Sequence, residues 1–363
     1  MESQAESRIM TEILTRQSTL IKAMRFPLIV MVLIIHSPGA YSSSEMEWSL
    51  EGWNIYHFFA ELLSGHISAI ATRCFFLFSG FLFFRYLKDG EFCMSWVLSK
   101  WKKRVFTLLI PYIFWNLLLV AAVVLKNSVF GAFSLGESPE EMSLVHQGPL
   151  FWFVTGPADY PLWYLRDLMV MTLLTPLIYC LIKYLRRASL VLLVLLYYAP
   201  LQFPFNQALF YFGIGAWLGI NHKDLIPLCH KVRIPAAVAA FMLLPVATSQ
   251  VGRPMHLLLF KCYIPLGIIT FINICDFMTR NDVIRNKLCA LSGSVFFIYA
   301  VHEIYILGWT KGLCLRLLGD SLVATWLRYF LVPVIVLGIC LLLYKLLNRW
   351  SPRALAFACG GRT

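Results

Sequence analysis

Long apolar stretches, separated by short polar segments, follow one another along almost the whole chain. A run of about 20 apolar residues is long enough to cross the hydrocarbon core of a bilayer as a helix. The pattern predicts ten transmembrane segments, at residues 24–41, 67–87, 105–125, 163–183, 189–204, 207–221, 234–249, 256–278, 289–309 and 326–347. The fifth, sixth and seventh are short for a full crossing. We therefore predict an all-α, polytopic integral-membrane bundle of about ten helices.

The composition favours the same class. Of the 363 residues, 59% are hydrophobic and 14% are charged, which is more apolar surface than a soluble domain can bury. The 31 Lys and Arg residues outnumber the 19 Asp and Glu residues. Such an excess also occurs in nucleic-acid-binding proteins, but in a polytopic protein it indicates loops that face anionic lipid. We therefore expect a lipid bilayer, and no nucleic acid, as a partner.

The ten cysteines are scattered along the chain without a CxxC pair. This spacing indicates neither a disulfide framework nor a zinc site, and no metal is expected. Residues 1–18 are polar, so the first apolar segment is expected to remain as a transmembrane helix and not to be removed as a signal peptide.

The placement of basic residues predicts the orientation of the chain. With the N-terminus inside, the outer loops hold only Lys126, Arg253, Lys311, Arg316 and Arg328. This positive-inside bias favours an even number of crossings with both termini in the cytoplasm. Residues 1–350 are predicted to form a single transmembrane domain, followed by a short cytoplasmic tail at 351–363. Of the predicted outer loops, 42–66 is acidic, and 126–162 is rich in aromatic residues that suit either sugar stacking or the membrane interface.

The first predicted helix carries two ionisable residues, Arg25 and His36. Eleven residues at about 100° each make nearly three turns, so both side chains lie on one face, roughly 16 Å apart along the axis. Ionisable side chains inside a membrane are costly and are commonly functional. A single buried histidine can also be structural, but its pairing with Arg25 on one stripe favours a functional role.

Further polar groups lie inside other predicted helices. Arg73 is either functional or an arginine that extends to the interface. Ser79 is explained by close helix packing as well as by function. Arg166 begins the fourth helix, where its neighbour Asp167 is a possible ion-pair partner. His302, in the ninth helix, is a weaker candidate than His36.

A basic cluster, Lys102, Lys103 and Arg104, precedes the third helix. Its simplest explanation is a topology signal, because cytoplasmic loops are rich in Lys and Arg. The same cluster also suits a phosphorylated cytosolic cofactor, since cations bind phosphate through charge-assisted hydrogen bonds. The two explanations are compatible.

Five segments, in chain order, together form a recognisable set. They are Arg25 with His36, CFFLFSGFLFF around Ser79, KKRVFTLLIPYIFWN from Lys102, PLWYLRDLMV with Arg166, and SGSVFFIYAVHE with His302. This set resembles the membrane acyltransferase 3 family, which are bacterial integral-membrane O-acyltransferases of cell-surface sugars. The resemblance extends over nearly the whole chain, and the combination of five segments is far more specific than any one of them.

The resemblance implies transfer of an acyl group, most simply acetyl, from cytosolic acetyl-CoA to a hydroxyl of a cell-surface or exported polysaccharide, in the bacterial inner membrane. His36 is the expected general base, and Arg73 and Arg166 are expected to stabilise the oxyanion of acyl transfer. Donor binding is expected at Arg25, Ser79 and the basic cluster Lys102, Lys103 and Arg104.

A transporter or flippase for a small polar solute or a lipid-linked sugar is the alternative function. Relatives of this fold are linked to export of surface polysaccharide. Against this alternative, the sequence shows no internal repeat of the transporter kind, no paired interrupted helices and no oppositely charged residues at matching depth.

Overall fold

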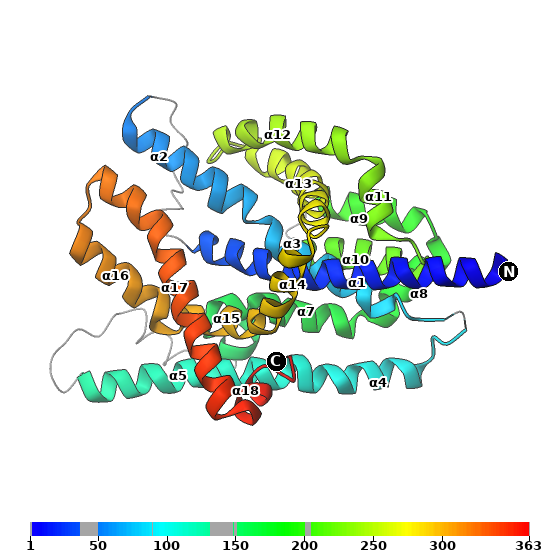
Figure 1. Cartoon of the computed structure of the whole chain (residues 1–363), viewed down its shortest axis with the longest axis horizontal. Helices are drawn as coiled ribbons and strands as arrows, with labels where there is room; N and C mark the ends of the chain where they lie inside the picture. Colours follow the sequence, from blue (N-terminus) through cyan, green and yellow to red (C-terminus); the bar gives the residue numbers. More distant parts are fainter. Residues whose placement is uncertain are drawn as a thin grey trace. The chain divides into compact units, whose positions relative to one another are not determined.

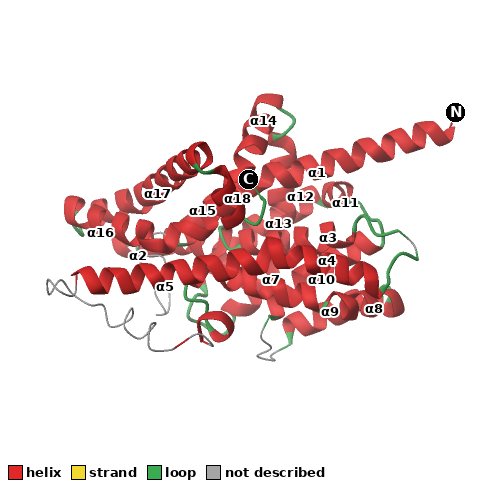
Figure 2. Cartoon of the chain, turned by 90° about the horizontal axis from the view of Figure 1, so that it is seen from below, coloured by secondary structure: helices red, strands yellow, loops and turns green. Residues whose placement is uncertain are grey.

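The computed structural model describes residues 2–36, 50–88, 90–130, 148, 151–199 and 205–362. Within these ranges the regular structure is entirely helical, as Figure 2 shows, so the all-α prediction is confirmed. The chain divides into two compact units: unit 1 comprises residues 1–89, 177–295 and 311–335, and unit 2 comprises residues 90–176, 296–310 and 336–363. Large parts of the two predicted outer loops, residues 42–49 and 131–147, lie outside the described residues.

Unit 1 contains the N-terminal helix and most of the central helices. Its elements are α1 (Glu2–Ile35), α2 (Gly52–Ala60), the π-helix η1 (Glu61–Ile67), α3 (Ile70–Phe84), α9 (Ala188–Tyr198), α10 (Asn206–Ile220), α11 (Leu225–Lys231), α12 (Arg233–Ser249), α13 (His256–Met278), α14 (Asp282–Leu291) and η6 (Ser292–Ser294). Helices α11 and α12 are bent against each other by 71°.

Unit 2 contains a long, continuous helical stretch formed by its first three elements. Its elements are α4 (Met94–Arg104), η2 (Val105–Leu109), α5 (Ile110–Phe130), η4 (Phe151–Thr155), η5 (Tyr160–Leu162), α7 (Trp163–Leu173), η7 (His302–Ile306) and α18 (Pro352–Ala358). Four further helices contain a boundary between the units: α8 (Thr175–Leu185), α15 (Val295–Val301), α16 (Leu307–Leu318) and α17 (Leu322–Trp350). The C-terminal residues pack inside unit 2, where the Trp115 indole donates to the carbonyl of Ala358 at 2.9 Å.

In the part of the chain that the structure describes, six helical stretches are long and apolar enough to cross a membrane, and the number rises to eight if each of two bent pairs is one crossing. All ten predicted segments coincide with helical chain in the described residues. Three of the helices at these positions, α9 with 11 residues, α10 with 15 and α12 with 17, are shorter than the roughly 20 residues of a full crossing. The protein is therefore a multi-pass membrane protein.

The closest helix pairing in unit 1 joins α3 to α10, which lie side by side in Figure 1. Glycines make this approach possible. A Cβ atom at Gly80 would lie 2.1 Å from the carbonyl oxygen of Phe212, and one at Gly215 would lie 2.0 Å from that of Leu77. Membrane helices associate through such small residues because lipid provides no hydrophobic driving force between apolar surfaces.

Two carboxylates hold the first half of α1 against other helices of unit 1. Asp276 of α13 is 3% exposed and accepts from Arg16 at 2.7 and 2.8 Å. Asp224, before α11, accepts from Gln17 at 2.7 Å and from the buried Arg85 at 2.5 Å. The Gln17 side-chain oxygen in turn accepts from the backbone N–H of Leu225 at 2.8 Å. The buried charges of Asp276 and Arg85 are tolerated because each has an ion-pair partner.

Gly215→Ala is expected to destabilise the protein by about 1–3 kcal/mol, because the added methyl group overlaps backbone of α3. Thermal unfolding of the detergent-purified protein, followed by intrinsic fluorescence, measures the effect. Gly312→Ala in α16 is the matched control, since a Cβ there meets nothing within 4 Å. Equal melting temperatures for the two variants would contradict the packing described for α3 and α10.

Candidate active site

One stripe of α1 carries Arg25, Ile29, Val32 and His36, because these positions are spaced by four, three and four residues. Arg25 is exposed, whereas Ile29 and Val32 are buried at 0% and 4% exposure. His36, immediately after the last residue of the helix, is half-buried. The chain is therefore helical from Arg25 to the residue before His36, with a packed apolar section between the two ionisable residues.

The end of α1 is held by hydrogen bonds within unit 1. The Ser64 hydroxyl donates to the carbonyl of Ile34 at 2.8 Å, which satisfies one of the carbonyls that a helix end leaves without an intrahelical partner. Ser64 also bonds to the Tyr329 hydroxyl at 2.7 Å, and the Tyr329 ring packs edge-on against Tyr56. Ser64 and Tyr329 thus fix the backbone two residues before His36.

Arg73 lies on α3, half-buried, and is bound locally. Its guanidinium donates at 3.0 Å to the carbonyl of Ala69 and at 3.0 Å to the Thr72 hydroxyl, and it stacks 5.6 Å from the Phe260 ring centroid. The Phe260 ring also contacts His66, which is fully buried. These contacts fix a cation inside unit 1 and are compatible with either explanation given for Arg73.

Close to Arg73, the π-helix η1 contains a buried acid and a buried histidine. The His66 Nδ1 atom lies 3.7 Å from the Glu61 carboxylate. The ring centroids of His66 and His256 are 5.3 Å apart. A Cβ at Gly65 would lie 1.8 Å from a carboxylate oxygen of Glu61, so the glycine provides the space that this acid occupies. π-Helical turns are frequent at functional sites.

Ser79 neighbours Gly80 in the tightly packed section of α3. Its side chain is half-buried. The close approach of α3 and α10 is at the neighbouring Gly80, where a Cβ would overlap the backbone of Phe212. The predicted place of Ser79 in donor binding stays a prediction.

The basic cluster Lys102, Lys103 and Arg104 forms the last turn of α4 in unit 2. Lys102 and Lys103 are exposed and Arg104 is half-buried. The helical chain continues without a break from α4 through η2 into α5, so the cluster lies within one long helix, before its most apolar section.

Arg166 is paired with its neighbour Asp167, which the sequence indicates as its ion-pair partner. Its Nε and one terminal nitrogen donate to the same carboxylate oxygen of Asp167 at 3.0 and 2.9 Å, and the other terminal nitrogen lies 3.4 Å from the carbonyl of Val154. The pair holds η4 near the start of α7 within unit 2.

Asp159, just before η5, is a polar residue that the sequence pattern did not single out. It is 1% exposed, and neither carboxylate oxygen has a hydrogen-bond partner among the described residues. Its backbone N–H donates to the Asn116 side-chain oxygen at 3.2 Å, and Asn116 itself donates to the carbonyl of Tyr112. Burial and, secondarily, the nearby carboxylate of Glu303 raise the pKa of Asp159 well above its ordinary value.

His302 is fully buried at the start of η7. Its Nδ1 atom lies 3.1 Å from the carbonyl oxygen of Ile298 and 2.8 Å from that of Tyr299. Carbonyl oxygens only accept, so Nδ1 carries the hydrogen and Nε2 carries the lone pair. Beyond it the helix is interrupted, with Tyr305 in the left-handed region at φ 59°. In the neutral imidazole the structure thus defines Nε2 as the basic nitrogen of His302, which was predicted to be a weaker candidate than His36.

The predicted site residues are divided between the units. Unit 1 carries Arg25, His36, Arg73 and Ser79, and unit 2 carries Lys102, Lys103, Arg104 and Arg166. The sequence did not identify Ser64, Glu61 and His66, or Asp159. A usable signal existed only for Asp159, as a single acid in the segment GPADYPL, which is otherwise apolar and rich in Pro and Gly.

Comparison with known proteins agrees with these features. The acyltransferase domain family matches residues 20–345, which include α1 from residue 20 onward and all of α3, α4, α7 and η7. The chain is also similar to the succinoglycan biosynthesis protein ExoH of Rhizobium meliloti (strain 1021), with 28% identity over 372 residues that cover 95% of this chain and 93% of that protein. No solved structure matches the chain.

Asp159→Asn is expected to raise the melting temperature at about pH 8, and to raise it much less at about pH 5. A carboxyl whose pKa is raised by folding binds its proton more tightly in the folded state. It therefore destabilises that state increasingly as the pH rises above its ordinary value of 3.8. Melting curves of the detergent-purified variant at both pH values test this, with the exposed Asp320→Asn as the control. A shift that is the same at both pH values would be the contrary result.

Proposed function

From the premise that the chain belongs to the acyltransferase 3 family, we propose that it transfers an acetyl group from cytosolic acetyl-CoA to a hydroxyl of a cell-surface or exported polysaccharide. That the protein is an acyltransferase follows from the family. The polysaccharide acceptor is supported by its relative ExoH, which is described as a succinoglycan biosynthesis protein. The proposal adds the identity of the acyl group, the donor and the residues that act on them.

The stripe of α1 with Arg25 at one end and His36 at the other carries the proposal. The two positions are separated by roughly 16 Å of helix. In the proposed topology both termini are cytoplasmic and about ten helices cross the bacterial inner membrane, so Arg25 lies towards the cytosol and His36 towards the outer half of the membrane. A donor that enters from the cytosol would then meet Arg25 before its acyl group reaches the level of His36.

The proposed reaction is a direct acyl transfer in which His36 is the general base. The imidazole removes the proton from the acceptor hydroxyl, and the hydroxyl oxygen attacks the thioester carbonyl. The resulting oxyanion collapses, the carbon–sulfur bond breaks, and the CoA thiolate leaves and takes up a proton. Histidine suits this role because its ordinary pKa lies near neutrality.

Cations are proposed for the remaining roles. Arg73 or Arg166 would stabilise the oxyanion, and Arg25 would bind a phosphate of the donor. The existing contacts of Arg73 with Thr72 and Phe260, and of Arg166 with Asp167, support this because they fix each guanidinium in place. Ser79 and the basic cluster Lys102, Lys103 and Arg104 are proposed on the donor side.

His36→Ala is expected to lower acetyl transfer at least about 100-fold, as loss of a general base typically does. The measurement incubates membranes with acetyl-CoA labelled in the acetyl group and follows the label in the polysaccharide. His57→Ala is the control, because His57 also lies in unit 1 and packs only against the rings of Trp53 and Tyr56 in the contacts that the structure gives. Normal transfer by His36→Ala, at an unchanged protein level in the membrane, would exclude the mechanism.

Arg25→Ala is expected to weaken binding of CoA roughly tenfold or more, in line with loss of a charge-assisted phosphate contact of about 1.5–3 kcal/mol. Titration of the detergent-purified protein with CoA measures this affinity. Lys22→Ala removes an exposed cation one turn earlier on α1 and is expected to bind CoA as the wild type does. Equal CoA affinities of the Arg25→Ala variant and the wild type would remove Arg25 from the donor site.

A further inference from the structure

Unit 1 contains a pocket of about 810 Å³ whose walls come from three separate stretches of chain. These stretches are the residues after α3, the end of α8 with the start of α9, and the end of α10 with the residues that follow it. Its volume is within the range of about 300–1,000 Å³ that is usual for small-molecule sites. None of the residues predicted from the sequence as donor-binding lines this pocket.

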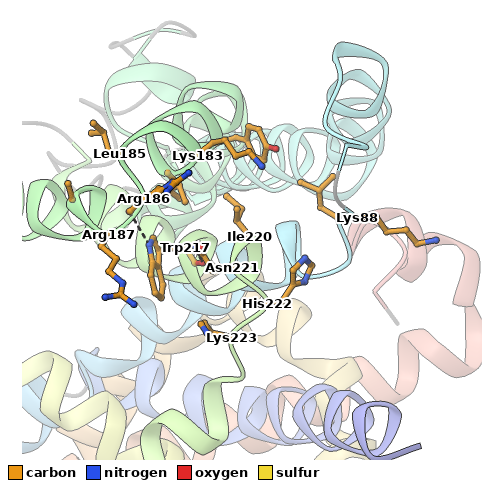
Figure 3. A pocket seen from close by; sticks show the side chains of 14 residues that line it. Lys88, Lys183, Leu185, Arg186, Arg187, Trp217, Ile220, Asn221, His222 and Lys223 are labelled. Atoms are coloured by element: carbon orange, nitrogen blue, oxygen red, sulfur yellow. Dashed lines mark hydrogen bonds between the residues drawn. The ribbon is translucent and has the colours of Figure 1, made fainter. Parts of the chain in front are cut away.

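The pocket is strongly basic. Its lining residues contain no Asp or Glu, and they include the five cations Lys88, Lys183, Arg186, Arg187 and Lys223. In Figure 3, Lys183 and Arg186 lie on one side and His222 and Lys223 on the other, with Trp217 between them. Cytoplasmic loops need basic residues for topology, but topology does not require them to surround a cavity.

The walls of the pocket also contain apolar and aromatic surface and a strained backbone. Tyr179, Ile182 and Ile220 line it beside Trp217, whose indole N–H donates to the carbonyl of Arg186 at 3.3 Å. Arg186 and His222 both have left-handed backbones, with φ of 49° and 50°. Non-glycine residues rarely adopt this conformation, and such strain collects at ligand sites.

The level of the pocket along α1 relates it to the proposed donor path. Lys223 directly precedes Asp224, and Asp224 and Leu225 are bound to Gln17 of α1. Gln17 lies eight residues before Arg25, or roughly 12 Å along the helix axis. Along α1, the point of attachment of the pocket wall at Gln17 therefore comes first, Arg25 second and His36 last.

We propose that this pocket binds the nucleotide end of the acyl donor, with its basic rim on the 3′-phosphate of CoA and Trp217 or Tyr179 against the adenine ring. The assignment rests on the proposed function for the identity of the donor. Five cations exceed the single charge of an ordinary phospholipid headgroup such as phosphatidylglycerol, whereas CoA carries three phosphates. An aromatic wall stacks on a purine base, as it does in other nucleotide-binding sites.

The test compares CoA with dephospho-CoA, which lacks only the 3′-phosphate. Binding to the detergent-purified protein is measured by titration calorimetry for the wild type and for Lys183→Gln/Lys223→Gln. The wild type is expected to bind dephospho-CoA at least about tenfold more weakly than CoA. In the double variant this discrimination is expected to fall to less than about twofold, because the cations that recognise the 3′-phosphate are absent.

The control is Lys231→Gln/Arg233→Gln, which removes the same charge from exposed residues of unit 1 outside the pocket and should retain full discrimination. Discrimination that persists in Lys183→Gln/Lys223→Gln would overturn the proposal. A wild type that binds CoA and dephospho-CoA equally would also overturn it. So would a double substitution that weakens binding of phosphatidylglycerol in nanodiscs but leaves binding of CoA unchanged.

Failure of this proposal differs from failure of the proposed function. If acetyl label reaches polysaccharide but the double variant has the wild-type KM for acetyl-CoA, only the pocket assignment is wrong. If no label is transferred by the wild type, the proposed donor itself is wrong. The expected result is a raised KM with an unchanged kcat, since the pocket is remote from the reacting carbonyl.

Discussion

The fixed position of α1 is the constraint on which the candidate site depends. In its first half, Arg16 and Gln17 are bound to Asp276 and Asp224, and at its end the carbonyl of Ile34 accepts from Ser64. Asp276, Gln17 and Ser64 are buried, so loss of a partner would leave a buried polar group unsatisfied at high cost. The section of α1 between these two attachments, which contains Arg25 to Val32, is therefore held against other parts of unit 1 at both ends.

The rest of unit 1 supports the position of α1 through close helix packing. Gly80 and Gly215 bring the backbones of α3 and α10 together, and Arg85 at the end of α3 is buried against Asp224. The same ion pair thus joins α3 to the segment that binds Gln17. Breaking a buried pair of this kind costs about 3–5 kcal/mol because the remaining charge has no partner. Close packing therefore holds α3 against α10, and the ion pair holds α3 against the segment that binds α1.

Local patterns explain which features could be predicted from the sequence. Apolar runs identify helices, and an eleven-residue spacing puts Arg25 and His36 on one face, because both depend only on helix geometry. Adjacent residues explain the Arg166–Asp167 pair. By contrast, Ser64 reaches Ile34 and Tyr329 across the fold, and the backbone of Asp159 is bound to Asn116 of α5. No periodicity encodes such contacts, and the pocket needs three stretches that are distant in the sequence.

The hydrogen-bond geometry of the histidines limits the possible chemistry. A general base needs a lone pair directed at its substrate and a second nitrogen held in a defined tautomer. In His302 two carbonyls fix Nδ1 as the donor, so Nε2 is the nitrogen that accepts a proton. For His36, the hydrogen bond from Ser64 to the carbonyl of Ile34 fixes the backbone two residues earlier. The fold therefore controls the two histidines at different points: the ring tautomer of His302, and the main-chain position that carries His36.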